Sequence, residues 1–123
     1  MAKPGLEMLV IDKVYEFTIW TTNHVSKFPK SYRFTIGDRI QLRLTQILET
    51  LVRSKYTQHR ASLLREANLD LELLRFQFRM AKDLKCLSLD SYGHASRAVN
   101  EVGRMVGGWM KRAAGPGAAP PES

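Results

Sequence analysis

The sequence predicts an all-α protein, an up-down-up-down four-helix bundle. In four segments, apolar side chains recur at alternating spacings of three and four residues, which is the period of a helix packed along one side. The connections between these segments are short, so consecutive helices are expected to run antiparallel. No segment shows a convincing strand pattern. The apolar fraction of 44% and the charged fraction of 25% are ordinary for a globular protein of this class.

The first helix is expected from about Glu7 to Lys27. Pro29 ends it, because proline has no amide donor and restricts the residue before it. For His24, which falls on the core-facing row, we expect a hydrogen-bonded structural role. That row is Val10, Val14, Phe17, Thr21, His24 and Phe28.

The second helix is predicted to follow a loop over residues 28–33 and to begin at Thr35. The hydroxyl of Thr35 can cap the helix, and Asp38 stands three residues later in the position of a capping-box partner. The expected core face of this helix is Ile40, Leu44, Ile47, Leu48, Leu51 and Val52. A polar stretch, residues 54–60, separates it from the third helix.

The third helix is predicted over residues 61–87 and carries two apolar rows on opposite sides, at about 100° per residue. The first row is Leu64, Ala67, Leu71, Leu74, Phe78 and Ala81. The second row, rotated by roughly 180°, is Leu69, Leu73, Phe76, Met80, Leu84 and Leu87. Two apolar faces need two partners, one inside the subunit and one outside it. We therefore predict an oligomer interface at Leu69, Leu73, Phe76 and Met80.

The fourth helix is expected to start after residues 88–91, which break the third helix and supply caps, and to run to about Ala113. Its buried row is Ala95, Ala98, Val99, Val102, Val106 and Trp109. Gly103 and Gly107 share a face with Ser96. They either allow another helix to approach closely, within or between subunits, or merely let Trp109 pack. Residues 1–113 thus form one domain, and residues 114–123 are a small, Pro/Gly-rich tail expected to be disordered.

The net charge of +7 is spread along the chain, which suits an anionic partner such as nucleic acid. On the third helix, a polar strip between the two apolar rows contains Arg75, Arg79 and Lys82. These cations lie on successive turns, so they can face one line of phosphates. The alternative is a solvated helix face or a set of ion pairs between subunits.

Catalytic and metal-binding patterns are missing from the sequence. The three histidines, His24, His59 and His94, have no ligand spacing, and there is no phosphate-binding or nucleophile motif. Cys86 is the only cysteine and is expected to be a small buried hydrophobe near a helix end. We therefore expect no enzyme activity, cofactor or metal. There is no apolar run of membrane-span length and no signal peptide, which predicts a cytoplasmic protein without membrane association.

Two stretches, residues 28–41 (FPKSYRFTIGDRIQ) and residues 68–112, resemble the accessory variability determinant (Avd) proteins of diversity-generating retroelements. The most specific parts are Leu74-Arg75-Phe76 with Arg79, and residues 101–109 (EVGRMVGGW). The chain is also similar to the wider four-helix-bundle family of proteins encoded in ribosomal RNA intervening sequences. Many of those carry an Asn-Ile-Ala-Glu-Gly element in the second helix, where this chain has LVRSK at residues 51–55, which favours the retroelement branch.

The resemblance implies a barrel-like homopentamer of four-helix bundles that binds a reverse transcriptase and, with little sequence preference, RNA and DNA. The complex would support mutagenic cDNA synthesis and retrohoming. Arg75 and Arg79 match family arginines of the partner-binding surface, whereas Lys82 is added from helix geometry alone. The alternative function is a purely structural or scaffolding oligomer of the intervening-sequence type, whose charge serves solubility.

Overall fold

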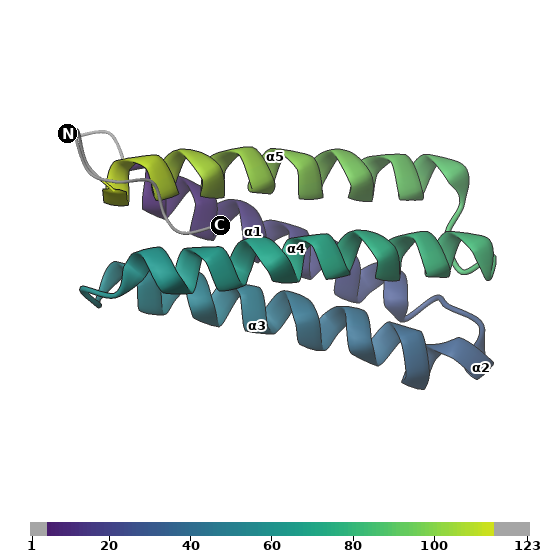
Figure 1. Cartoon of the computed structure of the whole chain (residues 1–123). Helices are drawn as coiled ribbons and strands as arrows, with labels where there is room; N and C mark the ends of the chain where they lie inside the picture. The colour runs from purple at the N-terminus through teal and green to yellow at the C-terminus, as the bar shows by residue number, and fades with distance from the viewer. Residues whose placement is uncertain (1–4, 115–123) are drawn as a thin grey trace.

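The computed structural model describes residues 5–114, and over this range the chain is helical and contains no strand. The four long helices are α1 (Leu6–Val25), α3 (Asp38–Lys55), α4 (Arg60–Asp83) and α5 (Leu89–Ala114). Each packs against its neighbours in the chain, and α1 also packs against α5, which closes the ring of helices (Figure 1). The predicted four-helix bundle is confirmed. The predicted disorder of the tail concerns residues that, beyond Ala114, lie outside the described range.

The core is built from the inward rows that the helical period predicts. All six residues of the first row of α4 and all six of the buried row of α5 are buried. In α1, Val10, Val14, Phe17 and Thr21 are buried as expected. His24 is half-buried, and its Nδ1 lies 2.9 Å from the carbonyl oxygen of Trp20, in agreement with a hydrogen-bonded structural histidine.

The connection between α1 and α3 differs from the prediction. The chain becomes helical again at α2 (Lys30–Tyr32) and continues through a π-helical segment, η1 (Arg33–Gly37), directly into α3. Thr35 therefore lies inside a helical segment, where its hydroxyl is 3.4 Å from the carbonyl oxygen of Ser31, and it does not cap a helix. The predicted loop over residues 28–33 is confirmed only for residues 28–29, and the predicted start at Thr35 is wrong.

Close packing of this connection against the end of α1 explains the difference. Phe28 lies beyond the last residue of α1, yet it is buried in the core. Gly37 is also buried, and a Cβ atom built on it would lie only 2.7 Å from Cγ1 of Val25. A residue without a side chain is needed for this close approach. The helical conformation of the connection satisfies backbone groups that a loop in the same place would leave to water.

The predicted core face of α3 is wrong at Val52. Val52 is 39% exposed, whereas Leu48 is half-buried and packs against the core. Thr50 and Ser54 take buried positions instead. The Ser54 hydroxyl donates a hydrogen bond of 2.8 Å to the carbonyl oxygen of Thr50, so its polarity is satisfied inside the helix.

The helix α4 ends four residues earlier than predicted, and a turn follows it. This turn changes where Leu84 and Leu87 lie. Lys85 has a positive φ of 63°, and the Cys86 amide donates to the carbonyl oxygen of Ala81 at 2.8 Å. This is the closing geometry of a Schellman motif. Because the turn reverses the chain, Leu87 packs into the core and does not extend the outer row. The amide of Ser91 donates to the Ser88 hydroxyl at 3.0 Å, so the predicted cap of the last helix is present.

Candidate nucleic-acid and subunit interface

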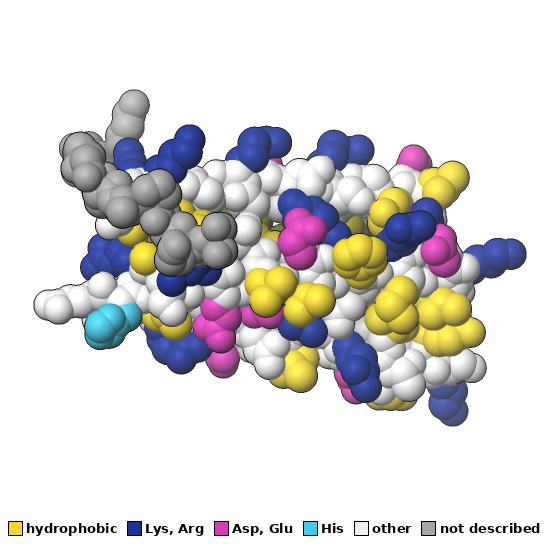
Figure 2. All heavy atoms as spheres, in the orientation of Figure 1, with side chains coloured by type: hydrophobic (Ala, Val, Ile, Leu, Met, Phe, Trp, Pro, Cys, Tyr) yellow, Lys and Arg dark blue, Asp and Glu magenta, His cyan; other side chains and the backbone are white. Residues whose placement is uncertain are grey.

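The second apolar row of α4 lies on the surface of the bundle. Its four predicted interface residues, here called the outer apolar row, are Leu69, Leu73, Phe76 and Met80, with exposed fractions of 60%, 41%, 59% and 51%. Figure 2 shows hydrophobic side chains gathered along the face of the molecule over α4. The core row of the same helix is completely covered, so α4 has one satisfied apolar face and one that remains available to a partner.

A second exposed apolar surface, which the sequence did not indicate, lies on α1 and α3. The Lys55 ammonium of α3 donates to the sulfur of Met8 at 2.9 Å, so this side of α1 faces α3. Tyr15 and Ile19 follow Met8 by seven and eleven residues, which places them on the same side, and both are exposed. Val52, one turn before Lys55, continues this surface. Tyr15, Ile19 and Val52 are called the α1/α3 surface below.

Arg75 is held between α4 and α5. Its Nε donates to the side-chain oxygen of Asn100 on α5 at 3.2 Å, and its guanidinium also pairs with Glu72 one turn earlier. A Cβ atom built on Gly103 would lie 3.2 Å from Nη2 of Arg75. The absence of a side chain at Gly103 therefore lets the guanidinium lie against α5. The ion pair of Arg75 is formed within the subunit.

Lys82 and Arg79 differ in how firmly they are held. The Lys82 ammonium lies 3.4 Å from Asp83 and 4.9 Å from the centre of the Tyr92 ring, so it spans from α4 to α5. Arg79 is exposed and has no ion pair or hydrogen bond through its side chain to any of the residues that the structure describes. Of the three predicted cations, Arg79 is thus the one whose charge is directed fully to solvent.

Arg75 also lines two adjoining hollows between α4 and α5, of about 210 and 410 Å³. Asn100 lines both, and Arg104 lines the larger one, so sequence-distant donors meet at one groove. Among the residues that the structure describes, a Cβ built on Gly107 would have no atom beyond its own helix backbone within 4 Å, and one built on Gly103 would have only the Arg75 side chain. The glycines therefore do not serve a close helix contact inside the subunit; a contact between subunits remains a prediction.

Metal or thiol chemistry receives no support from the described part of the chain. Residues 5–114 contain no group of three histidine, cysteine or acidic side chains that could hold a metal ion. Cys86 is half-buried, and burial raises the pKa of its thiol, which is opposite to the activation of a nucleophilic cysteine. Within the same residues, none of the helices has the length and hydropathy needed to cross a membrane.

Comparison with known proteins assigns the chain to a family. The model of the bAvd-like family matches residues 8–113. The fold is similar to the crystal structure, at 1.70 Å resolution, of a protein of unknown function from the S23 ribosomal protein family of Bacteroides thetaiotaomicron. The two chains share 14% sequence identity with a TM-score of 0.79, over 87% of this chain and 99% of that one. No curated protein matches the sequence.

Proposed function

The chain belongs to the bAvd-like family, and we propose from this that it is the accessory protein of a diversity-generating retroelement. In this proposal it is a non-enzymatic homo-oligomer that binds the reverse transcriptase and nucleic acid, and so supports mutagenic cDNA synthesis and retrohoming. The observation that carries the proposal is the outer side of α4, where an exposed apolar row runs beside Arg79 and the groove of Arg75. The helix α4 thus carries two adjacent surfaces, one suited to a protein partner and one suited to a polyanion.

Assembly is supported by the placement of the two exposed apolar surfaces. The outer apolar row is on α4. The α1/α3 surface is on α1, which lies diagonally opposite α4, and on α3, which lies between them. The two surfaces differ in composition, so a contact between them is heterologous and leads from one copy to the next. Such contacts close into a ring when the rotation between copies allows it. We propose the homopentamer that the family resemblance implies.

Nucleic-acid binding is supported by the net charge of +7 and by the position of Arg79. A ring would repeat Arg79 once per subunit and form a band of positive charge. Arg75 and Lys82 add charge at the same place, although their contacts to Asn100 and Tyr92 hold them against α5. Side chains arranged in this way contact phosphates and carry little sequence information.

The test uses Arg79→Ala together with a matched control, Arg39→Ala, which removes another exposed arginine, from α3. Arg79→Ala is expected to weaken binding to an RNA oligonucleotide, and to lower the salt slope of log Kd by about 0.7–0.9 for each phosphate that the variant no longer neutralises. It is also expected to reduce cDNA synthesis by the reverse transcriptase of the same retroelement. Arg39→Ala should change neither quantity.

A negative result would favour the alternative function, a structural or scaffolding oligomer. If the wild-type protein forms an oligomer but binds neither RNA nor DNA at low salt, and does not co-purify with the reverse transcriptase, the proposed function is refuted. Equal effects of Arg79→Ala and Arg39→Ala would instead show that general charge, and not the α4 surface, governs binding.

A further inference from the structure

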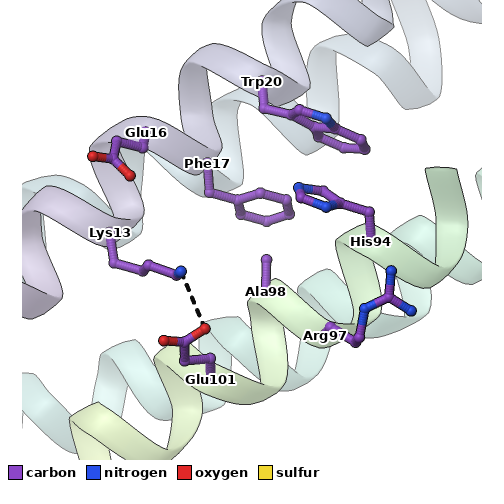
Figure 3. Close-up of a pocket in the computed structure, with 8 residues that line it drawn as sticks. All are labelled: Lys13, Glu16, Phe17, Trp20, His94, Arg97, Ala98 and Glu101. Atoms are coloured by element: carbon purple, nitrogen blue, oxygen red, sulfur yellow. Dashed lines mark ion pairs between the residues drawn. The ribbon is translucent and has the colours of Figure 1, made fainter.

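A groove of about 470 Å³ lies between α1 and α5, away from the outer apolar row and the Arg75 groove (Figure 3). The helices leave this space because Ala98, which forms part of its lining on α5, has only a methyl group to set against the rings of α1. Phe17 and Trp20 line the groove from α1, and His94 and Arg97 line it from α5. Aromatic and cationic side chains thus meet in one open groove.

The aromatic side chains of this groove hold one another in place. The Phe17 and Trp20 rings are stacked with centres 5.7 Å apart, and the His94 ring reaches over from α5 to within 4.6 Å of Trp20. His24 stacks on Trp20 as well, at 3.8 Å. Trp20 is partly buried and His94 is exposed, so an ordered ring is presented to the solvent. A planar ligand that stacks here does not have to order a mobile side chain.

A row of cations runs along the outer side of α5 from the edge of this groove. Arg97, Arg104 and Lys111 follow one another at seven-residue intervals, so they project from the same side of the helix about 10.5 Å apart. All three are exposed, and none has an ion pair among residues 5–114. They are called the α5 cationic row, and Figure 2 shows positive side chains along the outer edge of α5.

The acidic groups of the groove restrict where a polyanion can lie. Glu16 and Glu101 line the groove, and Glu101 is paired with Lys13 at 3.1 Å. Carboxylates repel phosphates, so a nucleic-acid backbone is disfavoured beside Glu16 and Glu101 and favoured along the α5 cationic row. An uncharged base can enter the groove, where the carboxylates can accept hydrogen bonds from its amino groups.

We propose that the α1/α5 groove and the α5 cationic row together bind single-stranded nucleic acid. A base stacks against the exposed His94 and the partly buried Trp20, which Phe17 supports from the core, and the phosphates follow the α5 cationic row. Stacking platforms beside a positive track are the usual design of single-strand binding sites, and a base inside a duplex cannot reach such a platform. The inference rests on the proposed function and deepens it, because it adds a single-strand site to the phosphate contacts proposed for Arg79, and Arg104 links this site to the Arg75 groove.

The test is a tryptophan-fluorescence titration of the full chain with a 20-nucleotide oligothymidylate, and with a DNA duplex of the same length. The single strand is expected to quench the emission, whereas the duplex should bind without quenching. Trp20→Phe should abolish the quenching while the buried Trp109 continues to report on the fold. Trp20→Ala should weaken single-strand binding on the order of tenfold, the effect typical of one stacked base.

The cationic row is tested by the double variant Arg97→Gln/Lys111→Gln, because Arg104 also lines the Arg75 groove. With about 0.7 per phosphate neutralised on a single strand, the salt slope should fall by about 1.4. The matched control removes two exposed cations from the opposite side of the bundle: Lys30→Gln/Arg53→Gln. Circular dichroism checks that both variants keep their helix content.

The outcomes separate this inference from the proposed function. If the wild-type protein binds no oligonucleotide at low salt, the nucleic-acid role fails, and this inference with it. If binding depends on Arg79 but not on Trp20 or the α5 cationic row, the inference is overturned and the proposed function stands. Quenching that survives in Trp20→Phe, or equal quenching by the duplex, likewise overturns it.

Discussion

Leu73→Glu is expected to dissociate the oligomer without unfolding the subunit. Leu73 lies in the middle of the outer apolar row, and 41% of it is exposed in the isolated chain. In a single subunit the introduced carboxylate can therefore remain in water, and glutamate is a good helix former. At a contact between subunits the same carboxylate would be buried among apolar side chains without a partner.

The size of the effect follows from the exposed area that the row offers. The exposed fractions of its four residues together amount to about two whole apolar side chains, and burying these contributes about 3–6 kcal/mol per contact at 1.5–3 kcal/mol each. An unpaired buried charge costs several kcal/mol. The substitution thus cancels most or all of the free energy of association that the outer apolar row can contribute. In a ring it does so at every contact between subunits.

Sedimentation velocity at micromolar concentration measures the result. The wild-type protein should sediment as one species several times the chain mass of 14.0 kDa, and Leu73→Glu should sediment as the monomer with an unchanged circular dichroism spectrum. The control is Leu42→Glu, which places the same charge at an exposed leucine of α3 outside both apolar surfaces, and should leave the oligomer intact. A wild-type monomer, or a Leu73→Glu variant of wild-type size, would refute the two-partner explanation of α4.

Two further predictions concern the stability of the subunit, measured by chemical denaturation. Thr21→Val should raise the free energy of unfolding by about 1 kcal/mol, because the buried Thr21 hydroxyl has no hydrogen-bond partner among residues 5–114 and valine has the same shape; a destabilised variant would show that the hydroxyl is satisfied after all. Lys85→Gly should raise it by about 0.5–1 kcal/mol, because glycine adopts the positive φ of the turn after α4 without strain. An unchanged or lower denaturation midpoint would mean that Lys85 compensates for its conformation through its charge at the helix end.

Much of the fold could be predicted from the sequence because helical periodicity is a local property. The spacing of Leu64, Leu71 and Phe78 on α4 is enough to place them on one side of a helix, and that side is buried. The same period correctly predicted that Leu69 and Phe76 lie away from the core. The period does not predict whether a second subunit covers them, because that depends on the surface of the other subunit.

The candidate site was predicted less completely, because the state of a cation depends on the neighbouring helix. Arg75, Arg79 and Lys82 have equivalent positions in the sequence pattern of α4. In the bundle, Asn100 and the space over Gly103 hold Arg75, the ring of Tyr92 attracts Lys82, and Arg79 alone stays open to solvent. The spacing of residues within α4 cannot predict this difference between the three cations, because their partners lie on α5.

The sequence by itself determined the four amphipathic helices, their inward rows and the surplus of positive charge, since each depends on residues close together in the chain or on composition. Only the tertiary structure decided where those helices stop and which surfaces remain uncovered. Leu87 is in the core because the turn at Lys85 reverses the chain. The groove beside Trp20 exists because a short side chain, Ala98, faces it from a helix far away in sequence. Packing between distant helices sets these features, and a local period contains no information about the neighbour that a helix will meet.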